Sequence, residues 1–130
     1  GYVLKCNGSK CAYITDTGFV TETVRQAAEN ADTLILEANH DVEMLKQGSY
    51  PPILKQRILS TRGHLSNESA GWLLANLPRI PEKIILAHLS QENNLPRLAH
   101  DTVRNILSEA SLFNDARIFV AAQDRIVKDY

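Results

Sequence analysis

The segment TLILEANHD, residues 33–41, places a short apolar strand directly before a group of polar side chains. Its first part, residues 33–38, is a continuous apolar run, which is typical of a strand covered on both faces. Glu37 ends the run of large apolar side chains, and His40 and Asp41 follow closely. The segment therefore predicts an internal strand that delivers chemically active side chains at its carboxyl end.

Two further predicted strands end in the same way. The apolar residues 12–14 lead to Asp16, and residues 84–87 lead to His88. Because ligands in α/β sheets bind outside the carboxyl ends of the strands, two carboxylates and an imidazole that converge there indicate a site. A set of carboxylate and imidazole ligands suits Zn, Mn or Fe.

Strands and helices alternate along the chain, which predicts an α/β layered architecture without an internal linker. An Asn-Gly pair predicts a hairpin between residues 2–6 and 10–15. Apolar spacing and capping residues predict helices, with Thr21, Ser66 and Asn94 as N-caps and Gly48 as a left-handed C-cap. The predicted helices are residues 21–30, 41–48, 51–59, 67–77 and 95–110, and the further strands are residues 83–88, 117–122 and 125–130.

The composition is that of one globular domain. The 130 residues are 44% hydrophobic and 22% charged with a net charge of −1, which argues against a disordered chain and against a globally basic nucleic-acid binder. No apolar run approaches the ~20 residues of a membrane helix and no signal peptide is visible, so we expect a cytoplasmic protein without a membrane partner. The chain begins with Gly in strand-like sequence, so we expect it to be part of a longer protein.

Charge is unevenly distributed along the chain. Residues 15–44 are mainly acidic and residues 46–83 mainly basic. Two solvated faces are the preferred interpretation of this pattern alone, and a cation site beside an anionic substrate is the alternative.

The pattern His-Leu-Ser-x-Glu occurs twice, at residues 64–68 and 88–92, each time before a predicted helix. Two interpretations remain open: a coincidence or a reused turn, or two histidines delivered to one cleft. The residues alone do not complete a metal hydrolase, because the chain has only four histidines and no H-x-H-x-D-H or H-E-x-x-H motif. Of the four, His100 falls within a predicted helix and is expected to be structural or exposed.

Four segments together resemble the C-terminal half of the metallo-β-lactamase-fold hydrolases, and most of all the branch of YycJ/WalJ-type bacterial nucleases. The resemblance covers nearly the whole chain, from about residue 1 to about residue 128. It implies the C-terminal half of a four-layered αββα fold, a mixed β-sheet flanked by helices, with the N-terminal half and its H-x-H-x-D-H motif absent. The four segments are ITDTG (14–18), LILEANHD (34–41), ILSTRGHLSNESAG (58–71) and LAHLSQENN (86–94).

The resemblance also implies roles for single residues. Asp16 matches the carboxylate that bridges two metal ions, and His88 matches the last histidine ligand. Glu37 and His64 match an acidic residue and a histidine beside the cleft, with His64 as a proton donor to the leaving oxygen. Weaker candidates for substrate binding are His40, Asp41, Ser90 and Asn93. Ser90, Glu92 and Asn93 are expected to order the loop after His88.

The function that the resemblance implies is part of a metal-dependent phosphodiesterase, a nuclease similar to DNA exonucleases. In the full-length protein two divalent ions, Zn or Mn, would activate water and stabilise the attacking and leaving oxygens. From this chain alone we expect weak metal binding or none, and no turnover. The implied partners are DNA or another nucleic acid, the missing N-terminal half and, through an exposed surface, a second copy of the chain.

Two alternatives to the nuclease remain. One is a non-catalytic module of the same half-fold, used for interaction or dimerisation. The other is a hydrolase of the same fold that acts on a small ester or thioester. An upstream H-x-H-x-D-H motif in the same reading frame would favour an enzyme, and salt-dependent DNA binding would favour the nuclease.

Overall fold

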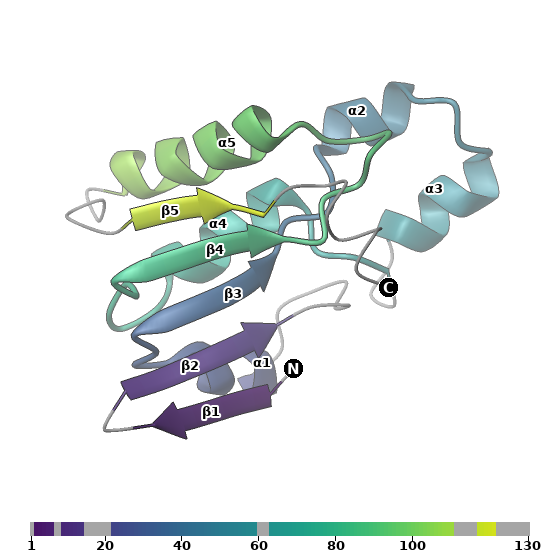
Figure 1. The fold of residues 1–130 in the computed structure, drawn as a ribbon. Coiled ribbons are helices and arrows are strands. Elements are labelled where there is room, and N and C mark those ends of the chain that lie inside the picture. The colour runs from purple at the N-terminus through teal and green to yellow at the C-terminus, as the bar shows by residue number, and fades with distance from the viewer. Residues whose placement is uncertain (1, 7–8, 15–21, 60–62, 111–116, 122–130) are drawn as a thin grey trace.

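The sheet is mixed, as predicted (Figure 1). β1 pairs with β2 in antiparallel orientation, and the other three pairings are parallel. Strand order in space follows strand order in the sequence, from β1 (Tyr2–Cys6), β2 (Ser9–Ile14) and β3 (Thr33–Glu37) to β4 (Lys83–Ala87) and β5 (Arg117–Val120). The structure is a computed structural model that describes residues 2–6, 9–14, 22–59, 63–110 and 117–121.

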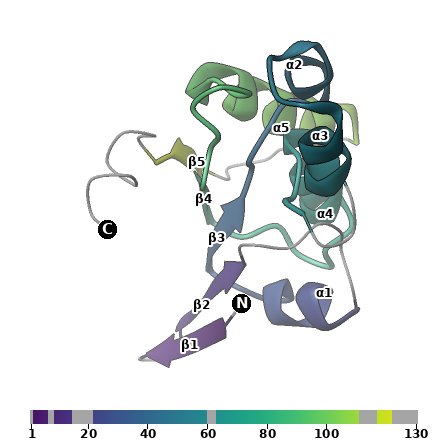
Figure 2. The same cartoon turned by 90° about the vertical axis from the view of Figure 1, so that its right-hand side faces the viewer.

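The described helices all lie on the same side of the sheet, as the view along its edge shows (Figure 2). They connect parallel strands, which require a crossover. None of them is long and apolar enough to cross a membrane. The helices are α1 (Glu22–Ala28), α2 (Val42–Gln47), α3 (Pro52–Leu59), α4 (Asn67–Ala75) and α5 (Pro96–Glu109).

The hydrophobic core fills the space between these helices and one face of the sheet. Alternate residues of a strand point to the same face, so every second residue of the central strands meets a helix. The strand residues of the core are Ala12, Ile14, Leu34, Leu36, Ile84 and Leu86, and the main helix residues are Ala28, Ala70, Leu73, Leu74, Ala99, Val103 and Leu107. The predicted α/β architecture is confirmed.

The other face of the sheet carries no described helix (Figure 2). The strand registers bring Tyr13, Ile35, Ile85 and Phe119 into one row across four strands on this face. These four side chains are half-buried or exposed, and Phe119 is 47% exposed. Within the described residues, the prediction that β3 is covered on both faces is therefore wrong for one face.

One predicted cap is confirmed and one has a different conformation. Ser66 caps α4, and its Oγ accepts the Ser69 N–H at 3.0 Å. Gly48 ends α2, but its φ of −76° is not left-handed. Space favours Gly here, because an added Cβ would lie 2.7 Å from Oδ1 of Asn93 and 3.0 Å from the Met44 carbonyl oxygen, so the Asn93 side chain would have to shift.

The predicted cap of α5 is wrong. Leu95 is the N-cap residue and makes no side-chain cap bond. The Asn94 side chain instead pairs with the buried Asn67, and each carboxamide donates to the other at 2.9 Å. Asn94 also donates to the carbonyl of Ala38, which ties the start of α5 to the end of β3. The Thr21 cap and the strand predicted at residues 125–130 lie outside the described residues.

A pair of neighbouring substitutions in β3 tests the one-sided burial. Leu36→Ala should lower the free energy of unfolding by about 2–5 kcal/mol, because Leu36 is fully buried against the helices. Ile35→Ala should cost clearly less in this chain, because Ile35 is half-buried on the other face. Urea denaturation followed by circular dichroism measures the free energy of unfolding of both variants. Equal losses of stability would contradict the one-sided burial of β3.

Candidate active site

The segment after β3 runs in extended form between the two His-Leu-Ser-x-Glu turns. The Asn39 N–H donates to the Leu65 carbonyl at 2.9 Å, and the Asn39 carbonyl accepts the Ser90 N–H at 2.7 Å. His40 forms an isolated parallel bridge with Ser66. The sequence repeat therefore has a structural role, since both turns are hydrogen-bonded to the same stretch of backbone.

Glu37 lies at the centre of this arrangement. Its side chain is fully buried at the end of β3. Its Oε2 lies 3.0 Å from Nδ1 of His64 and 3.6 Å from Nδ1 of His88, and its Oε1 accepts the Leu65 N–H at 2.9 Å. A buried carboxylate requires such partners, because an unpaired charge in the interior is costly. Each imidazole directs Nδ1 towards Glu37, so Nε2 is the ring nitrogen remote from the carboxylate.

His88 follows β4 in an uncommon backbone conformation, with a φ of 57°. The carboxamide of Asn39 supports this turn, because its Nδ2 donates to the His88 carbonyl at 2.8 Å. Oδ1 of the same carboxamide lies 3.2 Å from Nδ1 of His40. Asn39 was not predicted as a site residue. The one feature of the sequence that pointed to it is its position between Glu37 and His40.

His40, one of the weaker candidates for substrate binding, is buried with 1% of its surface exposed. The pKa of His40 is lowered to about 4, mainly by burial and also by the nearby His64, while the charges of Glu37 and Asp41 act in the opposite direction. His40 is therefore neutral at neutral pH and lies inside the protein.

Asp41 serves as a helix cap. Its Oδ2 accepts the Met44 N–H at 3.0 Å at the start of α2. Burial raises the pKa of the neighbouring Glu68, and the charge of Asp41 contributes to the same shift. The Asp41 carboxylate thus caps α2 and, as a like charge, disfavours the ionised form of Glu68 on α4.

Ser90 and Asn93, two of the three residues expected to order the loop after His88, are hydrogen-bonded in this region. The Ser90 Oγ accepts the Asn93 N–H at 3.1 Å, and the Asn93 carbonyl accepts the Asp41 N–H at 3.0 Å. Asn93 is 2% exposed and makes both of these hydrogen bonds through its backbone, whereas Ser90 lines a cavity.

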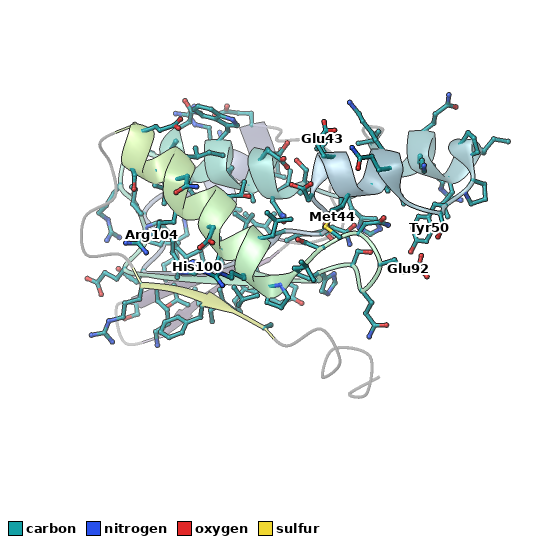
Figure 3. All side chains as sticks on the ribbon, turned by 90° about the horizontal axis from the view of Figure 1, so that it is seen from above. Glu43, Met44, Tyr50, Glu92, His100 and Arg104 are labelled. Atoms are coloured by element: carbon teal, nitrogen blue, oxygen red, sulfur yellow. The ribbon has the colours of Figure 1, made fainter. Side chains whose placement is uncertain are left out.

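This cavity of about 460 Å³ lies beside His64, between α3 and the loop after β4. Tyr50 and Glu92 both line it, and Figure 3 shows them at the same end of the molecule. The cavity therefore borders one of the two imidazoles that Glu37 holds.

Of the two predicted metal ligands, the structure describes His88 but not Asp16. Asp16 lies outside the described residues, and His88 is half-buried beside Glu37. Among the described residues there is no group of three or more His, Cys, Asp or Glu that could hold a metal ion. His100, which was expected to be structural or exposed, lies on α5, where its Nδ1 is 3.2 Å from Oδ1 of Asp101 (Figure 3).

Comparison with known proteins gives a consistent set of matches. Residues 1–89 match the family described as the beta-lactamase superfamily domain. The chain is 52% identical over 100 residues to the exodeoxyribonuclease WalJ of Streptococcus pneumoniae, and 43% identical over 109 residues to the exodeoxyribonuclease YycJ of Bacillus anthracis. These matches cover 76% and 83% of this chain but 37% and 41% of the relatives. The chain thus spans well under half of the length of either relative.

Two solved structures share the fold. The metallo-beta-lactamase fold protein YhfI from Bacillus subtilis matches with a TM-score of 0.54 and 21% identity, over 93% of this chain and 40% of its own. Zn²⁺-bound PqqB from Methylobacterium extorquens matches with a TM-score of 0.53 and 19% identity, over 92% of this chain and 39% of its own. At this identity the likeness shows the fold alone.

Removing the Glu37 carboxylate should destabilise the protein. Glu37→Ala should lower the free energy of unfolding by at least about 2 kcal/mol, because the buried Leu65 N–H loses its acceptor and a cavity remains. Glu43→Ala is the matched control, since Glu43 is exposed on α2 and its loss should stay within about 0.5 kcal/mol. Urea denaturation gives both values, and similar losses for the two variants would contradict the role of Glu37.

Stability should fall with acid because of His40. The pKa of His40 is about 4 in the folded protein against 6.5 in a model peptide, so the unfolded chain binds more protons between these values. This contribution to stability is fully present above pH 6.5 and is lost as the pH falls towards 4. His40→Leu should flatten the dependence of the urea midpoint on pH in that window. An unchanged slope would contradict the assignment of this acid sensitivity to His40.

Proposed function

Since the chain belongs to the beta-lactamase superfamily and to its YycJ/WalJ-type branch, we propose that it is the C-terminal portion of a metal-dependent DNA exonuclease acting in the cytoplasm. The observation that carries the proposal is the buried Glu37 carboxylate, which lies against the imidazoles of His64 and His88 at the carboxyl ends of parallel strands. The names of the two relatives support the choice of DNA as the substrate.

His88, through Nε2, and Asp16 are the residues of this chain that would hold the divalent ions, Zn or Mn, in the full-length protein. The chemistry of His88 fits this role, because a carboxylate near the other nitrogen of a ligating histidine orients the ring and raises its basicity. The described residues supply too few ligands for a complete centre, which supports a contribution from an H-x-H-x-D-H motif in the N-terminal half. Bound ions would supply an activated water and a Lewis acid.

Glu37 and His64 would handle the proton on the leaving group. Glu37 fixes the ring of His64 through Nδ1, as a buried carboxylate orients the histidine of a catalytic triad. The proton that His64 exchanges is then the one on Nε2. His64 keeps 38% of its side chain exposed beside the cavity, so a protonated ring could donate to the leaving 3′ or 5′ oxygen.

The uncovered row of Tyr13, Ile35, Ile85 and Phe119 is the surface on which the N-terminal half would pack. A row of half-buried apolar side chains across a sheet is a surface that another layer can cover. In this chain alone the row would be available to a second copy, and the incomplete ligand set would leave the fragment inactive.

Metal content and DNA cleavage of the full-length protein test the proposal. Asp16→Ala and His88→Ala should each lower the bound metal and abolish cleavage, while His64→Ala should keep the metal and lower kcat by about 10²–10⁴-fold. His100→Ala is the matched control and should behave like the wild type, because His100 lies on α5 outside the cluster. The 130-residue chain alone should not cut DNA.

Two results would replace the nuclease with its alternatives. A full-length protein that binds no metal, or whose activity survives Asp16→Ala, would favour a non-catalytic interaction module. A metal-bound protein that hydrolyses small esters or thioesters but leaves DNA intact would favour the small-molecule hydrolase.

A further inference from the structure

The cavity beside His64 combines apolar walls with a polar edge. Its volume of about 460 Å³ lies within the range of small-molecule pockets, ~300–1,000 Å³. The side chains of Leu54 and Ile58 come from α3, and Leu89 comes from the loop after β4. Tyr50 adds an aromatic ring just before α3 (Figure 3). Walls of this kind suit a ligand with a flat, weakly polar face.

Gln91 and Glu92 form the polar edge of the cavity, and both are exposed. The Gln91 carboxamide can donate and accept hydrogen bonds, and the Glu92 carboxylate accepts them. The edge of a nucleobase presents the same mixture of donors and acceptors, and carboxylates accept hydrogen bonds from the exocyclic amino group of cytosine. The polar edge therefore matches the edge of a base.

The charges of the described lining residues do not favour a phosphate as the main occupant of the cavity. The described residues that line it include no Lys or Arg. Glu92 adds a negative charge, which would repel a phosphate. His64, the one described lining residue that can become cationic, belongs to the Glu37 cluster at the border of the cavity. A nucleotide would thus place its base in the cavity and its phosphate towards His64.

We propose that this cavity binds the terminal nucleobase of a nucleic-acid strand and so positions the phosphodiester bond beside His64. The inference rests on the proposed nuclease function and adds a subsite to it. The base would stack on Tyr50 and pack against Leu54 and Ile58, and its edge would meet Gln91 and Glu92. Stacking on an aromatic ring tolerates every base, which suits an enzyme that removes nucleotides one after another from a strand end.

Binding of deoxynucleoside monophosphates to the metal-free full-length protein tests this site without turnover. Isothermal titration calorimetry with dAMP, dCMP, dGMP and dTMP is compared with 2-deoxyribose 5-phosphate, which has the same phosphate and no base. The nucleotides should bind at least about fivefold tighter than the sugar phosphate, because base stacking supplies the difference. Equal binding of the two kinds of ligand would overturn the proposal.

Three substitutions locate the binding energy. Tyr50→Ala should remove the advantage of the nucleotides over the sugar phosphate, and Tyr50→Phe should keep it because the ring remains. Gln91→Ala should weaken nucleotide binding without affecting folding, since Gln91 is exposed. Trp72→Ala is the matched control: Trp72 is 53% exposed and lies outside the cavity, so nucleotide binding should not change. Nucleotide binding that depends on Trp72 and not on Tyr50 and Gln91 would overturn the proposal.

The outcomes separate this site from the proposed nuclease activity. A wild-type protein that cuts DNA but does not distinguish nucleotides from the sugar phosphate refutes the base site alone. A protein that fails to cut DNA but binds nucleotides through Tyr50 and Gln91 refutes the nuclease function and supports the base site.

Discussion

A single buried carboxylate holds the candidate site together. Glu37 ends the central strand β3 with its side chain fully buried, and a buried carboxylate requires hydrogen-bond partners. Its partners come from two distant turns: the imidazole of His64 and the Leu65 N–H from one, and the imidazole of His88 from the other. The requirement to pair this charge thus fixes the positions of two histidines that are far apart in the sequence.

The parallel sheet supplies the rigidity that this pairing needs. β3 and β4 are adjacent and in register, so Glu37 lies opposite Ala87 and next to the turn that contains His88. The mutual hydrogen bonds of Asn67 and Asn94 then link α4 to the start of α5 behind the site. The cavity beside His64 lies outside this framework, where a substrate can reach it.

Much of this arrangement could be predicted from the sequence, because it depends on local patterns. Apolar runs predicted β3 and β4, and the rule that ligands bind at carboxyl ends directed attention to Glu37 and His88. The pairing of Asn67 and Asn94 could not be predicted, because each is an ordinary polar residue near the start of a helix until the fold brings them together across 27 positions. The burial of His40 was missed for the same reason. The uncovered row of Tyr13, Ile35, Ile85 and Phe119 contradicts the prediction that the strand at residues 33–38 is covered on both faces. An apolar run has the same sequence whether a chain contains both covering layers or only one of them.

The tautomers of His64 and His88 test most directly the claim that Glu37 holds both imidazoles. Nitrogen-15 NMR of the ring nitrogens at neutral pH distinguishes a proton on Nδ1 from a proton on Nε2. If Glu37 holds both imidazoles, both neutral rings carry the proton on Nδ1, facing Glu37, and Glu37→Gln removes this preference. Neutral rings protonated mainly on Nε2, with no change in the Glu37→Gln variant, would contradict it.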